Sequence, residues 1–203
     1  MKKLYLGLNP QPGTIHYPVI RTEVCTCDIK SAMALWPEFT HIIFTSQSAV
    51  HYWPGPWDKK IIAIGPATGS ALQKKGLDPL IAREATQEGV IELIKEIRDS
   101  EVYFFLPRSS RARPLLTDYL RLNNISFFAL DLYDTVLQKL EPIPCLEEID
   151  EIIFSSPTTV DGFIQIYGKL PKDKKLTTIG PVTARALARC FGCDKEKITK
   201  ILG

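Results

Sequence analysis

The 203-residue sequence predicts an α/β fold of two similar domains, each with a parallel sheet flanked by helices, joined by a two-stranded antiparallel linker. A phrase that occurs twice is the first indication: IGPATGSAL begins at Ile64 and IGPVTARAL at Ile179, with six of nine positions identical. A second pair occurs in the same order, IIFTSQSAV from Ile42 and IIFSSPTTV from Ile152. Short apolar runs also alternate with helix-like segments, which is the pattern of successive β/α units.

Each repeated phrase is expected to be a strand followed by a helix. The runs HIIF (41–44) and EIIF (151–154) are short, apolar and rich in isoleucine, as strands buried on both faces are. The serines and threonines that follow suit helix starts, because their oxygens accept hydrogen bonds from first-turn amides. Pro66 suits the first helical turn, since proline has no N–H to leave unpaired, and Gly76 suits the turn after the helix.

The segment between the two copies continues the alternation. Residues 86–100 carry an apolar stripe every three to four positions and predict a helix, and residues 112–124 predict another. Strands are expected at 78–82 and 102–107, followed by an extended run at 125–136. These segments complete about four β/α units, enough for a small domain.

The second copy is incomplete, with only two clear units after residue 150. Its sheet needs further strands, and the unassigned apolar segment KLYLGLN at the N-terminus supplies one. We therefore expect a discontinuous domain of residues 1–24 plus 137–203, with residues 31–129 inserted into it. Residues 25–30 and 130–136 would then be the two linker strands.

Composition and charge exclude several classes of function. The net charge of +2 is too even to predict nucleic-acid binding. No apolar run approaches the roughly 20 residues of a membrane span, and the N-terminus does not resemble a signal peptide. We therefore expect a cytoplasmic protein with no membrane or nucleic-acid partner.

Standard cofactor motifs are missing. The sequence has no G-x-G-x-x-G after a strand, no G-x-x-x-x-G-K-[ST] and no G-x-S-x-G. Four cysteines, in CTC (25–27) and CFGC (190–193), could supply zinc ligands, but we favour inert, buried thiols such as Cys190 near a helix end. No metal and no cofactor are expected.

Ligands of open parallel sheets bind beyond the carboxyl ends of the strands. Helix starts there carry unpaired N–H groups that suit a large polyanion. Because the four repeated turns fall at this position, we expect them to bind substrate, although capping a helix is an alternative role for each hydroxyl. The candidate substrate-binding residues in these turns are Thr45, Ser46, Gly65, Ala67, Thr68, Ser156, Gly180 and Thr183.

Two further features could take part in chemistry. Arg108, Arg111 and Arg113 in LPRSSRARPLL follow a strand end, where they either grip carboxylates or form a solvated helix start. Tyr133 lies in the second crossover, where its phenol either donates a proton or packs between domains.

Taken together, these phrases resemble the uroporphyrinogen-III synthase family. The segments IIFTSQSAV, IGPATGSALQKKGL, ATQEGVIELI, LYDT, DEIIFSSPTTV and IGPVTARAL occur in the family's order and spacing over about residues 40–192. The resemblance implies two α/β domains with the active site in the cleft between them. It implies hydroxymethylbilane, a linear tetrapyrrole with eight carboxylates, as the substrate, and no metal or organic cofactor.

The resemblance also implies roles for particular residues. Tyr133 in LYDT matches the family's tyrosine, the best candidate for a general acid. Thr68 and Thr183 match its two helix-start threonines. Arg108-Ser109 resembles an Arg-Gly pair of the family, with serine in place of the glycine that would allow close approach of the backbone to substrate.

The sequence departs from the family at both ends. LYLGLNPQPGTIHYPVI has neither the usual Thr-Arg strand end nor a full helix after it, and the chain stops soon after Gly192, where members continue through another β/α unit. A non-catalytic two-domain binding protein for an anionic small molecule is therefore an alternative, and a nucleotide-binding regulatory module is a third. A monomer is expected, with transient contact to the preceding enzyme of the pathway as a further expectation.

Overall fold

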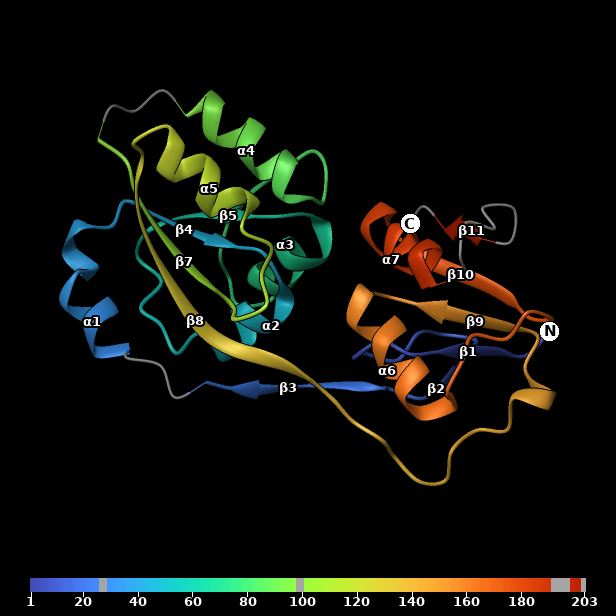
Figure 1. Ribbon diagram of the computed structural model, residues 1–203. Coiled ribbons are helices and arrows are strands. Elements are labelled where there is room, and N and C mark those ends of the chain that lie inside the picture. Colours follow the sequence, from blue (N-terminus) through green and yellow to red (C-terminus); the bar gives the residue numbers. More distant parts are fainter. Residues whose placement is uncertain (26–28, 98–100, 191–197, 202–203) are drawn as a thin grey trace. The chain divides into compact units, whose positions relative to one another are not determined.

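The computed structural model describes residues 1–25, 29–97, 101–190 and 198–201. The chain divides into two compact units (Figure 1). The discontinuous unit comprises Met1–Arg21 and Thr135–Gly203, and the inserted unit comprises Thr22–Asp134. The chain passes from one unit to the other within β3 (Ile20–Val24) and again within β8 (Ser126–Leu137).

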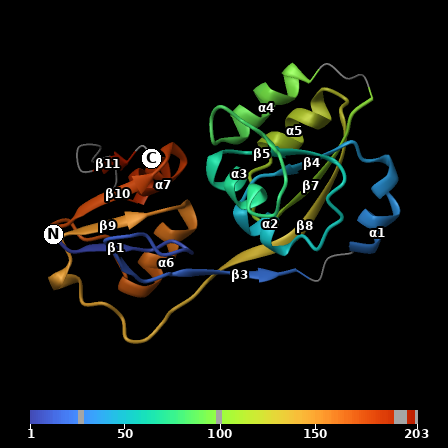
Figure 2. The ribbon, with the colours of Figure 1, turned by 180° about the vertical axis from the view of Figure 1, so that it is seen from behind.

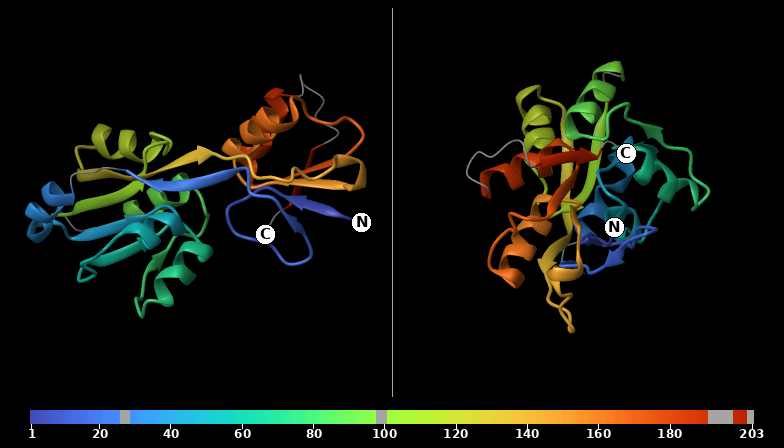
Figure 3. Two further views of the ribbon diagram at one scale, coloured as in Figure 1. Left: turned by 90° about the horizontal axis from the view of Figure 1, so that it is seen from below. Right: turned by 90° about the vertical axis from the view of Figure 1, so that its right-hand side faces the viewer.

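The inserted unit has a six-stranded sheet in the order β3-β8-β7-β4-β5-β6. Strands β4 to β8 pair in parallel, as β/α units require. Strand β3 lies beside β8 (Figure 3). The other elements of the inserted unit are α1 (Ile29–Ala34), η1 (Trp36–Glu38), β4 (His41–Phe44), α2 (Gln47–Tyr52), β5 (Lys60–Ala63), α3 (Pro66–Gln73), β6 (Leu80–Ile81), α4 (Gln87–Glu96), β7 (Tyr103–Ser109) and α5 (Leu115–Leu122).

Both faces of this sheet are buried, which explains why its central strands are mainly apolar. Ile42 and Phe44 point to one face and Ile43 to the other, because successive side chains of a strand alternate. The first face packs against α1, α2 and α3, and the second packs against α4 and α5, which lie side by side in Figure 1. The parallel sheet flanked by helices that the sequence predicts is confirmed.

The discontinuous unit has a five-stranded parallel sheet in the order β11-β10-β9-β1-β2 (Figure 2). Helices α6 and α7 contribute to one core cluster with residues of β1, β9 and β10. Residues 6–14, all of them described, connect β1 to β2 without a helix. Its elements are β1 (Lys3–Tyr5), β2 (Ile15–His16), η2 (Leu146–Glu148), β9 (Glu151–Phe154), α6 (Pro157–Tyr167), β10 (Lys175–Ile179), α7 (Pro181–Cys190) and β11 (Ile198–Ile201).

A buried carboxylate links three strands of this sheet at their amino ends. Glu151 is fully buried, and its Oε1 accepts a hydrogen bond of 2.6 Å from the Thr177 hydroxyl. Lys175 Nζ lies 3.1 Å from the same oxygen, and Lys3 Nζ lies 3.5 Å from Oε2. Burial raises the pKa of Glu151, but these neighbours outweigh burial and hold it below its usual value. The carboxylate lies at the opposite edge of the sheet from the repeated turns.

Several expectations differ from the structure. The strand expected over residues 25–30 lies earlier, at Ile20–Val24, and residues 29 and 30 already belong to α1. Cys190 is exposed rather than buried, because it is the last residue of α7 and follows Leu187, the last buried residue of that helix; Cys27 and Cys193 lie outside the described residues. The chain adds the strand β11 after α7, although the sequence showed only two units after residue 150.

Candidate functional site

Polar side chains gather at the carboxyl ends of the parallel strands in the inserted unit. Thr45 and Ser46 follow β4, Gly65 follows β5, and Arg108 and Ser109 end β7. Because parallel strands end at one edge of a sheet, the fold brings these residues to the same edge. Thr45 and Arg108 line the same small pocket.

Tyr133 belongs to this group through a direct contact with Ser46. The two hydroxyl oxygens are 2.7 Å apart, and Tyr133 is only 5% exposed. Burial raises the pKa of Tyr133, while hydrogen bonds with Ser46 and Ser48 lower it to a smaller extent. The phenol is therefore protonated at neutral pH and held in place at the start of α2.

An irregularity in strand pairing orients this tyrosine. Arg108 pairs with Asp131, whereas Ser109 pairs with Tyr133, so β8 has one extra residue, Leu132, at this point. Leu132 and Tyr133 consequently belong to the same core cluster, although neighbours on a regular strand face opposite sides. The bulge therefore turns Tyr133 toward the face of the sheet that carries α2 and Ser46.

Ser46 also caps a helix, which was the alternative role for this hydroxyl. Its Oγ accepts a hydrogen bond of 3.0 Å from the Ala49 amide while it contacts Tyr133. The amide holds the serine oxygen, and the serine in turn holds the phenol. Capping and orientation of Tyr133 are thus performed by one side chain.

Each of the three arginines after β7 pairs with a carboxylate of the same unit. Arg108 Nε donates to Asp131 at 2.9 Å, and Arg111 Nε donates to Asp134 at 2.8 Å. Arg113 makes two parallel hydrogen bonds to Glu88, of 3.2 and 3.0 Å. Protein carboxylates therefore orient these arginines, although the Arg111 and Arg113 side chains remain 60% and 38% exposed.

Ser109 stands where the family resemblance implies a glycine. Its side-chain oxygen accepts a hydrogen bond of 3.2 Å from the Arg111 amide, so the hydroxyl stabilises the turn that follows β7. Backbone pairing continues past it, because the Ser110 amide donates to the Tyr133 carbonyl at 2.9 Å. The serine thus has a local structural role in this turn.

The start of α3 has no side-chain cap, because Gly65 precedes it. A Cβ on Gly65 would lie 2.6 Å from the Ala85 Cβ, closer than side chains approach each other, so close packing requires the glycine. Ala67 is exposed in the first turn, whereas the Thr68 side chain is only 4% exposed. The groups that α3 presents at this end are therefore backbone amides more than the threonine hydroxyl.

The equivalent turns of the discontinuous unit repeat this arrangement in part. Ser156 and Thr159 form a capping box at the start of α6, where each side chain accepts a hydrogen bond from the other's backbone amide. Thr183 is buried like its counterpart Thr68. Gly180, however, has a φ of +79°, whereas Gly65 has an extended backbone, so the two glycines are not conformationally equivalent.

The discontinuous unit also has a tyrosine–serine pair that sequence reasoning missed. Tyr5 ends β1, is 7% exposed and hydrogen-bonds to Ser155, and burial raises its pKa. Its ring stacks on His16 at 6.0 Å, and His16 Nε2 lies 2.8 Å from the Gly7 carbonyl. The pair lies at the carboxyl ends of β1 and β9, whereas Ser46 follows β4 and Tyr133 lies within β8, opposite Ser109 at the end of β7. The one feature of the sequence that could have indicated this pair is an aromatic residue, Tyr5, at the end of a predicted strand.

The fold and these sites define a class: an α/β protein of two related units, with hydroxyl and arginine side chains gathered at the carboxyl ends of parallel strands. A comparison with protein families matches residues 13–192 to the family described as uroporphyrinogen-III synthase HemD. The chain belongs to the uroporphyrinogen-III synthase family, which confirms the resemblance seen in its motifs.

Individual relatives agree with this assignment. Two archaeal proteins, both named provisionally as uroporphyrinogen-III synthases, are 26% identical. The match to the one from Methanocaldococcus jannaschii spans 143 residues, 66% of this chain and 59% of the relative. The match to the one from Methanothermobacter thermautotrophicus spans 175 residues, 74% of this chain and 69% of the relative. The chain thus spans less than two thirds of the first relative.

Solved structures show the same fold. A mutant uroporphyrinogen III synthase from the extremely thermophilic bacterium Thermus thermophilus is similar with a TM-score of 0.63 at 19% identity, over 94% of this chain and 89% of that one. The uroporphyrinogen-III synthetase from Helicobacter pylori has a TM-score of 0.69 at 16% identity, over 93% and 88% of the two chains.

Proposed function

We propose that the chain catalyses the cyclisation of hydroxymethylbilane to uroporphyrinogen III, with inversion of the terminal pyrrole ring. The substrate's terminal hydroxyl leaves with a proton as water, which produces an electrophilic azafulvene. The substituted carbon of the last pyrrole then attacks to form a spiro intermediate. That ring detaches and rejoins in the inverted orientation before the macrocycle closes. Family membership supports this reaction.

The hydrogen bond between Tyr133 and Ser46 is the observation that carries the mechanism. Loss of the substrate hydroxyl requires a proton donor, and the raised pKa keeps Tyr133 protonated at neutral pH. Either hydroxyl of the pair can be the donor in their 2.7 Å contact. When Ser46 donates to the phenol oxygen, the Tyr133 proton is free to move to the departing hydroxyl. Ser46 is then a positioning residue and Tyr133 the general acid.

The remaining candidate residues bind and position the substrate in this proposal. Without positioning, the azafulvene would close directly, without inversion. Arg108, Thr45 and the amides at the start of α3 supply donors for the substrate's carboxylates. Holding the chain so that the substituted carbon is nearest the electrophile is catalysis by proximity.

The test is the identity of the product. Freshly generated hydroxymethylbilane is incubated with the protein, and the uroporphyrinogen isomers are oxidised and separated. The proposal expects the inverted type III isomer in excess over a reaction without protein. Formation of the type I isomer alone would refute it.

The alternative, a binding protein for an anionic small molecule, has one observation in its favour. Ser109 stands where the resemblance implies a glycine, so a side chain is present where the backbone would otherwise approach the reacting substrate. Tight binding of the bilane without any cyclisation would favour this alternative.

The cellular setting is also proposed on the basis of family membership. Among the described residues, no helix has the length and apolar character needed to cross a bilayer. We propose a cytoplasmic monomer that needs no cofactor and receives its unstable substrate through transient contact with the enzyme that makes it. Native mass spectrometry of the protein alone and mixed with that enzyme tests both the monomer and the contact.

A further inference from the structure

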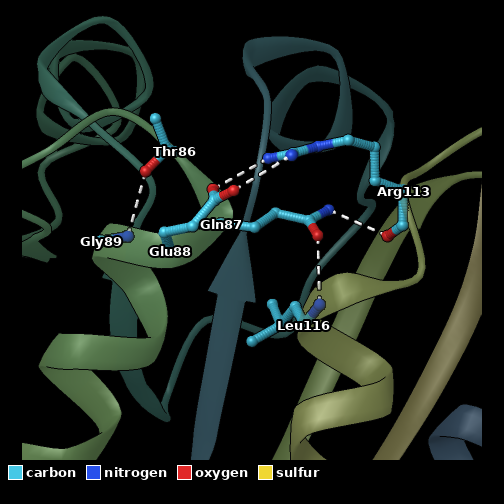
Figure 4. Close-up of polar contacts among 6 residues, drawn as sticks. All are labelled: Thr86, Gln87, Glu88, Gly89, Arg113 and Leu116. Atoms are coloured by element: carbon cyan, nitrogen blue, oxygen red, sulfur yellow. Dashed lines mark hydrogen bonds and ion pairs between the residues drawn. The ribbon is translucent and has the colours of Figure 1, made fainter. Parts of the chain in front are cut away.

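The first turn of α5 is held by a side chain from another helix. Pro114 precedes this helix and supplies no side-chain cap. Instead, Gln87 reaches across from the first turn of α4, as Figure 4 shows. Its Oε1 accepts a hydrogen bond of 3.1 Å from the Leu116 amide, and its Nε2 donates one of 3.0 Å to the Arg113 carbonyl. The oxygen and the nitrogen of one carboxamide therefore both hydrogen-bond to backbone groups of residues 113–116.

Glu88, the next residue of α4, contacts the same segment through the side chain of Arg113. Glu88 receives both hydrogen bonds of the Arg113 guanidinium, and these contacts lower the pKa of its carboxyl group. The contacts made by Gln87 and by Glu88 differ in exposure. Gln87 is 7% exposed, whereas the side chains of Glu88 and Arg113 are 52% and 38% exposed. The buried carboxamide is therefore the more strongly constrained contact, and the ion pair is screened by solvent.

The first turn of α4, which carries Gln87 and Glu88, is stabilised by contacts of its own. Thr86 caps α4 by accepting a hydrogen bond of 3.1 Å from the Gly89 amide. Gly89 leaves no space for a side chain, because a Cβ there would lie 2.2 Å from the Glu84 carbonyl oxygen. The sequence TQEG at 86–89 thus fixes the first turn of α4 and, through it, residues 113–116 (Figure 4).

The held segment forms one wall of the small pocket at the carboxyl ends of β4 and β7. Thr45 and Arg108 line the pocket from the strand ends, and Gln87 lines it as well. Asp131 occupies the Nε donor of Arg108, whose guanidinium has two further nitrogens. The residues around the pocket are Thr45, Gln87, Leu106, Arg108, Ala112, Arg113, Leu116 and Thr117.

We propose that this pocket binds one carboxylate arm of the substrate and that Gln87 is the residue that positions its wall. The inference rests on the proposed function for the identity of the ligand. Arginine and threonine are donors that suit a carboxylate, and the pocket has room for about one water-sized group, enough for a single carboxylate oxygen at the end of an acetate or propionate arm. Gln87 acts through the Arg113–Leu116 segment rather than by chemistry on the substrate.

The kinetic test replaces Gln87 by leucine, which removes both hydrogen bonds at similar volume. The KM for hydroxymethylbilane should rise about tenfold while kcat changes by less than about threefold, since one positioned contact is lost and the acid at Tyr133 is untouched. Gln87→Glu, which keeps an acceptor for the Leu116 amide, should lie between leucine and wild type. Glu92→Gln, on the exposed side of α4, is the matched control and should match wild type. An unchanged KM in Gln87→Leu would overturn the proposal.

A second readout does not depend on activity. The amide signals of Thr45 and Arg108 in the full chain are followed by NMR during titration with sodium propionate. In the wild type these signals should shift with saturation, and in Gln87→Leu the shift should be lost while Leu116 amide exchange accelerates. Absence of a wild-type shift would overturn the pocket, and unchanged Leu116 exchange would overturn the role of Gln87. If no uroporphyrinogen III forms but these shifts occur, the proposed function fails and the carboxylate site stands.

Discussion

Replacement of Tyr133 by phenylalanine is the sharpest test of the chemistry, because it removes one oxygen atom and keeps the ring. The ring packs in the core of the inserted unit, 5.7 Å from the ring of Tyr52, and that packing is retained. The substitution removes the 2.7 Å contact with Ser46, the hydrogen bond with Ser48 and the proton that the phenol carries.

The two losses have different expected magnitudes. Loss of the phenol's hydrogen bonds with Ser46 and Ser48 lowers the free energy of unfolding by about 0.5–1.5 kcal/mol for each bond, and Ser46 keeps its bond from the Ala49 amide, which limits the penalty. Loss of a general acid lowers the rate by about 10²–10⁴-fold, which corresponds to about 3–5 kcal/mol in the activation barrier. Activity should therefore fall far more than stability.

The assay measures kcat with fresh hydroxymethylbilane and the unfolding midpoint of the same preparation. Tyr17→Phe is the matched control, since Tyr17 is 4% exposed and its hydroxyl donates a single hydrogen bond of 2.8 Å to the Leu140 carbonyl. Both variants should lose stability, and only Tyr133→Phe should lose turnover. A kcat for Tyr133→Phe within about twofold of wild type would remove Tyr133 from the acid's role.

The pH dependence provides a second check on the same residue. Burial raises the pKa of Tyr133 above the usual tyrosine value of about 10, so the acid stays protonated across the neutral range. The contribution of Tyr133 to turnover should be constant there and fall only above about pH 10. Its contribution to stability has the same sign: it is present below the unfolded pKa and lost as pH rises through the folded one. A fall in the Tyr133-dependent rate between about pH 7 and 9 would contradict this assignment.

Three further predictions concern stability. Gly65→Ala should lower the free energy of unfolding by about 1–3 kcal/mol through its clash with Ala85, and adding Ala85→Gly should restore part of the loss in urea titrations. Thr178→Val should raise it by about 1 kcal/mol, because the Thr178 hydroxyl is buried without a hydrogen-bond partner among the described residues; a loss would indicate an unrecognised partner. Glu151→Gln should cost about 1–3 kcal/mol at pH 7. Since the pKa of Glu151 is lowered, this difference should disappear as pH falls below about 4, and a difference that persists at pH 2 would contradict the assignment.

The alternation of strands and helices could be predicted because it depends on local patterns. HIIF and EIIF are apolar on both faces, and the structure buries every residue of both strands. Gly76 follows α3 with a φ of +79°, as its place after the helix predicted. The expectations failed where local signals were weak, as at residues 25–30, where a helix begins within the expected strand.

The candidate site could be predicted only in part. The positions of Thr45, Ser46, Arg108 and Tyr133 near one sheet edge follow from strand order and from the rule that ligands bind at carboxyl ends. The capping role of Ser46 was foreseen as an alternative, but its contact with Tyr133 was not. These two residues lie 87 positions apart, and no local pattern links them.

The sequence by itself determined the α/β class, the duplication and the family, because these are encoded in hydrophobic period and in repeated phrases. Only the tertiary structure decided which side chains meet. The extra residue in β8 turns Tyr133 to the face of Ser46, and Gln87 reaches a helix that begins almost thirty residues later in the chain. Such contacts depend on strand register and on the packing of distant helices, which arise only when the whole sheet has assembled.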